Sequence, residues 1–267
     1  MITDFPEEAR WLTEDERAFI VKKLAADQGS SGLEARITWR SVVETFSDWK
    51  MIPGALMYFG PAVSAYGEYL PAAMVTSIAL YHLTYHKQTG LAYFIPSIVL
   101  TYGYTPIQAQ LHSVAPWAAA VVLSLSVAYL SDKIKSRFSF IIFGLCLALC
   151  GNLVLFTVHD NRRVQYAAVF LYLMGVISML PVVVCLFTMN LKGHRNRAVG
   201  TAWQVGFGNC AGIIATFAFP SADAPRYRLG YSLGLGFLCL AGAAALAYFV
   251  GCLMANKRRG GTDRFIL

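Results

Sequence analysis

Acidic residues are almost absent from most of this chain, and their absence constrains its fold more than any other feature. Only five of the 15 acidic residues follow residue 50, namely Glu68, Asp132, Asp160, Asp223 and Asp263. Overall, 57% of the residues are hydrophobic and 14% are charged, whereas an average soluble domain has about 45–50% and about 25%. A water-facing globule needs more charge, and a disordered chain is far less apolar. The composition therefore predicts an integral membrane protein.

Long apolar runs that do not alternate predict transmembrane helices and not the strands of a membrane barrel. These runs lie at about 51–81, 91–102, 112–131, 139–158, 166–190, 199–219 and 229–252. About 20 residues are needed to cross the bilayer core, so each of the last five runs predicts one span. The first run is too long for one straight span and the second is too short, so we expect one irregular span within 51–102. The sequence predicts an all-α membrane protein with six transmembrane helices over 51–252.

Basic residues predict the orientation of these spans, because Lys and Arg are enriched in cytoplasmic loops. With six spans and an inner N-terminus, 17 of the 22 basic residues fall in the inner segments 1–50, 131–138, 191–198 and 253–267. We therefore expect both termini, including a basic tail over 253–267, in the cytoplasm. We expect the plasma membrane as the location of this integral membrane protein. The net charge of +7 then reflects membrane topology, and no nucleic-acid partner is expected.

The segment 1–50 is predicted to be cytoplasmic and to contain two short amphipathic helices. Thr13-Glu14-Asp15-Glu16 has the Thr-x-x-Glu form of a capping box, which predicts a helix over about 14–27. A Gly/Ser-rich break at 28–32 follows, and a second amphipathic stretch, Trp39 to Trp49, leads to the membrane. We interpret the segment as a solvated linker, with membrane-surface binding as the alternative.

The loop at 128–137 reads Ala-Tyr-Leu-Ser-Asp-Lys-Ile-Lys-Ser-Arg. An aspartate beside cations can hold a helix end through charge-assisted hydrogen bonds and so act as a conformational latch, although inner-side topology alone also explains the cations. The loop resembles a motif of the major facilitator superfamily, Gly-x-Leu-x-Asp-Arg/Lys-x-Gly-Arg/Lys-Arg/Lys. Ala128 and Lys135 replace its two glycines. The latch candidates among the matching residues are Asp132, Lys133 and Arg137.

Further stretches resemble a narrower family, the fungal allantoate permease-like transporters (the anion:cation symporter family). They lie at 4–12, 14–17, 58–61, 101–105, 200–209 and 223–227. This resemblance covers nearly the whole chain. It implies that the six spans are helices 7–12, the C-terminal half of a twelve-helix fold, and that the partner six-helix half is missing from this chain. It also implies proton-coupled symport of small organic anions such as vitamins, carboxylates or ureides.

Polar residues inside the apolar runs are the candidates for substrate contact. Gln204 and Asn209 carry amides that need partners in hydrocarbon, and the resemblance places them on helix 11, which contributes to the transport cavity in this superfamily. Pro53 and Gly60-Pro61 interrupt the helical hydrogen-bond ladder, and interrupted helices recur at transporter binding sites. Three further candidates lie around that interruption: Tyr58, Ser64 and Tyr66. Helix packing alone is the alternative role for all five.

Nothing in the sequence places catalytic or metal-binding groups together. The six cysteines all lie in predicted spans without a Cys-x-x-Cys motif, and His82 and His86 lack a third ligand. Gly208 and Gly212 have the spacing of a small-residue helix-packing face and not of a nucleotide-binding loop. We therefore expect no enzyme activity, no metal and no cofactor.

The segment 68–90 is the least expected part of the chain. When it is set aside, residues 64–67 join 91–96 to form one kinked span of about 28 residues, similar to helix 7 of the family. We hypothesise that 68–90 derives from a retained intron, in which case Glu68 is not a functional intramembrane carboxylate. An alternative to transport stays open: a truncated, non-transporting product, or a six-helix membrane protein that acts only by association.

Overall fold

The computed structural model describes residues 11–28, 39–82, 106–158, 161–218, 228–259 and 265, and within them every regular element is a helix. The helices are α1 (Glu14–Gln28), α2 (Trp39–Phe46), α3 (Met51–His82), α5 (Pro106–Ile134), α6 (Arg137–Thr157), α7 (Arg162–Met189), α8 (His194–Asn209), α9 (Ala211–Ala218) and α10 (Arg228–Arg259). The predicted all-α class is confirmed for this part of the chain.

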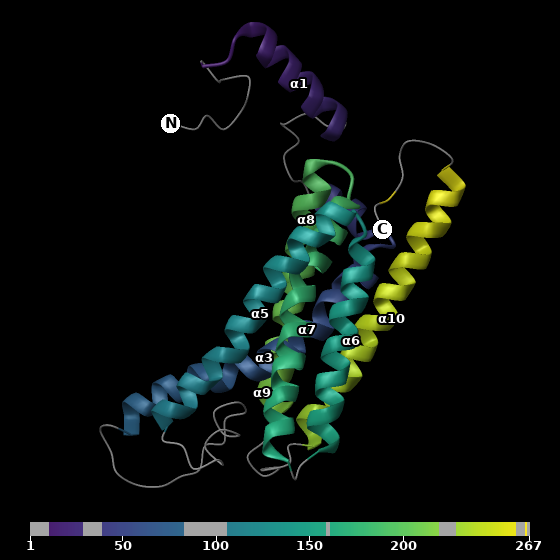
Figure 1. Ribbon diagram of the computed structural model, residues 1–267. Coiled ribbons are helices and arrows are strands. Elements are labelled where there is room, and N and C mark those ends of the chain that lie inside the picture. Colours follow the sequence, from purple (N-terminus) through teal and green to yellow (C-terminus); the bar gives the residue numbers. More distant parts are fainter. Residues whose placement is uncertain are drawn as a thin grey trace.

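Helices α3, α5, α6, α7, the α8–α9 pair and α10 form one elongated bundle, while α1 lies apart from it (Figure 1). Successive helices run in opposite directions. The start of α3, the α5–α6 turn, the α7–α8 turn and the end of α10 therefore lie at one end of the bundle (Figure 1). We call this the basic end, because the described cations Lys133, Lys135, Arg137, Lys192, Arg195, Arg197, Lys257 and Arg258 belong to these segments.

Four helices of the described residues are long and apolar enough to cross a membrane. They are Val114–Ile134, Arg137–Thr157, Arg163–Met189 and Arg228–Arg258. Helix α3 and the α8–α9 pair also extend along the bundle between its two ends (Figure 1). Their assignment as the other two of six spans belongs to the proposal below.

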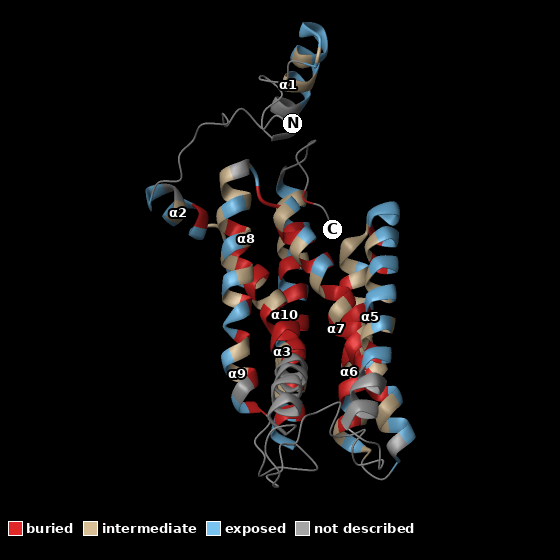
Figure 2. Ribbon diagram, turned by 90° about the vertical axis from the view of Figure 1, so that its left-hand side faces the viewer, coloured by how far each residue is buried: buried red, intermediate tan, exposed pale blue. Residues whose placement is uncertain are grey.

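Helices α6 and α7 share the most extensive contact between any two described helices. A Cβ atom at Gly175 would lie 2.4 Å from the backbone nitrogen of Ala148, and one at Gly151 would lie 2.5 Å from that of Tyr172. The two backbones therefore meet directly, which is how small residues pack membrane helices. Buried residues run along the middle of the bundle in Figure 2, and large exposed apolar side chains such as Val122, Leu125 and Leu246 surround it, as expected of a surface that faces lipid.

One expectation about helix geometry is corrected by the structure. We expected an interruption around Pro53 and Gly60-Pro61, but α3 is a single helix from Met51 to His82. Pro53 lies in the first turn, where no intrahelical donor is needed. Packing against neighbouring helices retains the helix at Pro61, where the residues around it are buried. The interruption that does occur lies at Cys210, between α8 and α9.

The hypothesised insertion at 68–90 is only partly within the described residues. Helix α3 extends through its first part to His82, and residues 83–105 lie outside the described part of the chain. The apolar run 91–102 and the stretches at 101–105 and 223–227 also lie outside it. The retained-intron hypothesis therefore stays a prediction.

Candidate functional site

Two of the five candidate substrate contacts meet at an open surface between α3 and α8. The hydroxyl of Tyr66, on α3, donates a hydrogen bond to Oδ1 of Asn209, the last residue of α8, at 2.5 Å. Asn209 is exposed and Tyr66 is half-buried. The contact joins residues 143 positions apart in the sequence, so it exists only because α3 and α8 pack together.

The Tyr66–Asn209 pair lies directly beside the interruption of the α8–α9 pair. The backbone N–H of Cys210 bonds to the carbonyl of Phe207 at 3.1 Å and not to that of Gly206, its normal acceptor in an α-helix. Gly206 is exposed, and a Cβ there would meet nothing within 4 Å. The carbonyl of Gly206 accepts from Sγ of Cys210 at 3.6 Å. The exposed amide of Asn209 therefore lies directly beside a break in the helical hydrogen-bond ladder.

Tyr58 fills the space left by Gly208. A Cβ at Gly208 would lie 2.2 Å from the Tyr58 ring, and one at Gly212 would lie 3.8 Å from the Tyr66 ring. The close packing predicted at Gly208 is confirmed. Only a glycine at 208 lets the Tyr58 ring lie this close to α8, whereas a Cβ at Gly212 would make an ordinary van der Waals contact with the Tyr66 ring.

Gln204 and Ser64 lie inside the bundle and not at its surface. Gln204 is fully buried, and its Nε2 donates to the carbonyl of Gly54 on α3 at 2.9 Å. Its Oε1 has no hydrogen-bond partner among the described residues. Ser64 is buried and its Oγ donates to the carbonyl of Gly60 at 3.4 Å. These two side chains contact backbone carbonyls of α3, while Tyr66 is half-buried and Asn209 is exposed.

The latch candidates form one ion pair within the α5–α6 turn. A guanidinium nitrogen of Arg137 lies 2.5 Å from Oδ1 of Asp132, so the pair joins the end of α5 to the start of α6. Arg137 is largely buried while Asp132 and Lys133 are exposed. Lys135 has a φ of 57°, the left-handed conformation that glycine adopts without strain. The superfamily motif has glycine at that position.

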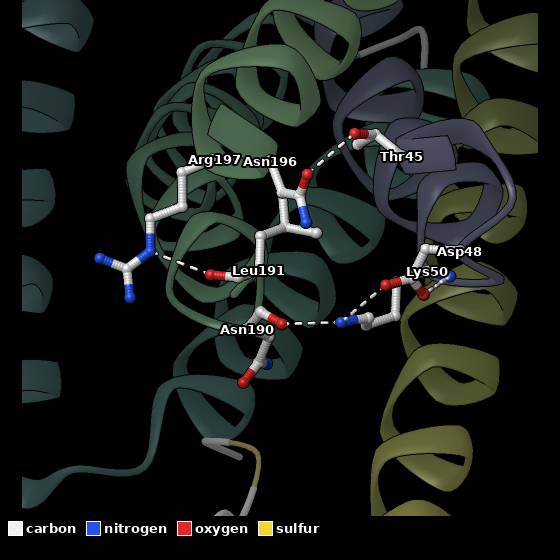
Figure 3. Close-up of polar contacts among 7 residues, drawn as sticks. All are labelled: Thr45, Asp48, Lys50, Asn190, Leu191, Asn196 and Arg197. Carbon is white, nitrogen blue, oxygen red and sulfur yellow. Dashed lines mark hydrogen bonds and ion pairs between the residues drawn. The ribbon is translucent and has the colours of Figure 1, made fainter. Parts of the chain in front are cut away.

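A second polar cluster, at the basic end, was not predicted from the sequence (Figure 3). The side chain of Lys50 is only 5% exposed and its Nζ lies 3.0 Å from Oδ2 of Asp48. The same Nζ donates to the carbonyl of Asn190 at 2.7 Å and lies 4.6 Å from the centre of the Phe265 ring. The start of α3 is thereby fixed to the α7–α8 turn. The sequence signal for this cluster was Lys50 itself, a single lysine directly before a long apolar run.

No metal-binding group was found in the part of the chain that the structure describes, where no three His, Cys, Asp or Glu residues lie close enough together. Cys252 is buried and the other five cysteines are exposed on the surface of the bundle.

The chain is similar in sequence to fungal membrane transporters. The chain is 30% identical over 228 residues to the major facilitator-type transporter hxnP of Emericella nidulans, covering 85% of this chain and 41% of that protein. The chain is a homologue of major facilitator-type transporters. It is also 28% identical over 260 residues to the MFS-type transporter cnsO of Penicillium expansum, covering 95% of this chain and 46% of that protein.

A third relative has a named substrate. The chain is 28% identical over 148 residues to the high-affinity nicotinic acid transporter of Saccharomyces cerevisiae, covering 55% of this chain and 28% of that protein. The chain spans less than half the length of each of these relatives. No family model matches the chain, and no solved structure matches it.

Proposed function

We propose that this chain is the C-terminal half of a secondary transporter that moves small organic anions across the plasma membrane together with protons. In this proposal α3, α5, α6, α7, the α8–α9 pair and α10 are helices 7–12 of a major facilitator fold, and the basic end faces the cytoplasm. The named transporters among its homologues support the activity. The nicotinic acid transporter among them supports a carboxylate substrate. Alternating access would then move this half against its partner half around a site near the middle of the membrane.

The observation that carries the proposal is the Tyr66–Asn209 pair beside the interruption at Cys210. Asn209 accepts from Tyr66 through Oδ1, so its Nδ2 protons are the groups with which it can bind another acceptor. A solute carboxylate could accept from that amide and, by replacing Oδ1, from the Tyr66 hydroxyl as well. We therefore assign direct solute contact to Tyr66 and Asn209. Tyr58 and Gln204 support the packing of α3 on α8, while Ser64 bonds within α3.

The Asp132–Arg137 ion pair has a conformational role in the proposal. It joins two helix ends at the basic end, where an inward-opening transporter must separate its halves. The pair, with Lys133 beside it, would act as the latch that holds this end in one state, because releasing a charge-assisted hydrogen bond requires free energy.

An uptake assay with a chimera tests the proposal. The chain would be fused behind the N-terminal half of the yeast nicotinic acid transporter and produced in cells that lack their own transporter. We expect saturable uptake of radiolabelled nicotinate, or of another small organic anion in a panel, that depends on an inward proton gradient. Asn209→Ala and Tyr66→Phe should each lower uptake at least about tenfold, since a site that bonds a polar substrate group discriminates strongly when one bond is removed.

The matched control is Tyr129→Phe, which removes the hydroxyl of an exposed tyrosine on α5 and should leave uptake within about twofold. A chimera that reaches the cell surface and transports no member of the panel would overturn the transporter assignment and favour a protein that acts only by association. Uptake that survives both site substitutions would overturn the site and leave the activity standing.

A further inference from the structure

Helix α2 exposes an apolar face whose orientation is fixed by the rest of the bundle. Trp39 and Val43 are 82% and 52% exposed, and their spacing places them on one side of the helix. Phe46, which is 41% exposed, lies at the edge of this side. We call this side the outer face of α2. Ile52, near the start of α3, is also exposed.

Three contacts attach α2 to α8, two from the side opposite the outer face and one from Phe46 at its edge. Thr45, which is buried, donates through Oγ1 to Oδ1 of Asn196 at 3.0 Å (Figure 3). Glu44 lies 3.9 Å from a guanidinium nitrogen of Arg195, and the ring of Phe46 packs edge-on against Trp203 with centroids 4.9 Å apart. The outer face is therefore held away from the bundle and is not the product of a fraying helix.

The position of α2 matches the boundary of a membrane. In Figure 2 it projects sideways from α8 near the basic end and does not continue the line of the bundle helices. Helices α5, α6, α7 and α10 are long and apolar enough to cross a bilayer, so a helix that lies across their direction near one end is at the level of the lipid headgroups. Tryptophan is enriched at that level.

Charge at this position favours an anionic surface. Arg40, on α2, has an 89% exposed side chain and only a surface ion pair with Glu44 at 3.5 Å. Lys192, in the adjacent α7–α8 turn, is also exposed, and the basic end as a whole carries the cations described above. An amphipathic helix with an apolar face and flanking cations binds the interface of a membrane that contains anionic lipid.

We propose that α2 is an interfacial helix whose outer face inserts into the headgroup–acyl boundary of the leaflet at the basic end, with Arg40 and Lys192 against anionic headgroups. A solvated linker, our interpretation from the sequence, does not account for an exposed Trp39 on a helix fixed at this level. The proposal needs the bundle to be in a membrane and does not need it to transport.

Spin-label accessibility in the full chain tests the proposal. Val43→Cys would be labelled in a variant without native cysteines and reconstituted in phosphatidylcholine vesicles with and without phosphatidylserine. We expect the label at Val43 to be relaxed more by oxygen, which partitions into lipid, than by a water-soluble nickel complex, at a depth of about 5–10 Å below the headgroups. Two exposed positions are the matched controls: Phe19→Cys on α1 should report water, and Val122→Cys on α5 should report the acyl core.

Two results would overturn the insertion. The label at Val43 could be relaxed by the nickel complex as strongly as the label at Phe19, which would mean a solvated helix, or be shielded from both reagents, which would mean that a protein partner covers it. The headgroup contact has its own test, because phosphatidylserine should draw the Val43 label deeper and Arg40→Gln should remove that shift, while Lys22→Gln on α1 should retain it. A shift unchanged by Arg40→Gln would overturn the role of Arg40.

Discussion

Lys135 adopts a backbone conformation that its side chain disfavours. Its φ of 57° costs an L-residue about 1–2 kcal/mol relative to glycine, and glycine costs about 0.5–1 kcal/mol in lost chain entropy. We therefore predict that Lys135→Gly stabilises the chain by about 0.5–1 kcal/mol, measured as the free energy of unfolding in detergent.

The neighbouring Lys133 is the control for this prediction, because it is an exposed residue within α5. Lys133→Gly should destabilise by about 0.5–1 kcal/mol, since glycine is unfavourable inside a helix. Equal effects of the same sign at both positions would contradict the assigned conformation of the turn.

Gly208 is a second residue whose size decides the packing around it. An added Cβ would lie 2.2 Å from the Tyr58 ring, so Gly208→Ala should destabilise by about 1–3 kcal/mol through overpacking. Gly206→Ala, two residues away on the same helix, adds a methyl group into open space and should stabilise by about 0.5–1 kcal/mol, because alanine is favoured over glycine inside a helix. Thermal unfolding of the two variants side by side checks the prediction, and an equal loss in both would contradict the α3–α8 contact.

At the scale of single elements, the cap of α1 was predicted well because it is local. Thr13 and Glu16 bond reciprocally: the carboxylate accepts from Thr13 Oγ1 at 2.8 Å and from its N–H at 3.1 Å, and Glu16 N–H donates to Thr13 Oγ1 at 3.4 Å. A four-residue motif contains both partners, so the sequence alone specifies this geometry.

The same cap predicts a pH dependence. Hydrogen bonds from the Thr13 hydroxyl and backbone N–H lower the pKa of Glu16 below its ordinary value of 4.5, because they favour the charged carboxylate. Its contribution to α1 is therefore complete above pH 4.5 and is lost as the pH falls through the lowered pKa. The carboxyl carbon shift of Glu16, followed by NMR as the pH is lowered, should titrate below 4.5.

Thr13→Val removes the hydroxyl while retaining the shape of the side chain. In this variant the pKa of Glu16 should rise toward its ordinary value. A titration that is unchanged by Thr13→Val would show that the cap does not cause the shift.

Helix interruptions were harder to predict than helix existence. Pro61 suggested an interruption of α3, yet neighbouring helices retain it as one helix, because burial stabilises a helix beyond its local propensity. The interruption at Cys210 has no proline to indicate it. Its only local signals were the nearby glycines, which the sequence had assigned to packing.

At the scale of the whole molecule, the sequence indicated which end of each helix carries the cations, since that pattern depends only on residue order. It also selected Asn209, because an amide in an apolar run needs a partner. It selected Tyr66 because this residue lies near the interruption expected at Gly60-Pro61, which the structure does not show. It could not pair them, since their contact depends on how α3 packs on α8. The Lys50 contact with the Asn190 carbonyl could not be predicted either, because every residue has a backbone carbonyl.

In the proposed topology this bundle crosses a membrane and its basic end faces the cytoplasm. Ser139 and Thr157 are exposed residues near the two ends of α6, and each can be changed to cysteine in a variant without native cysteines. A membrane-impermeant maleimide should label Thr157→Cys in intact cells and Ser139→Cys only after permeabilisation.

Ser47→Cys, an exposed position just before α3, extends this measurement to α3 and α5. It should behave like Ser139→Cys, because α3 and α5 would each cross the membrane once between these two positions. Labelling of Ser139→Cys and Thr157→Cys from the same side, or of Ser47→Cys and Ser139→Cys from opposite sides, would contradict the account.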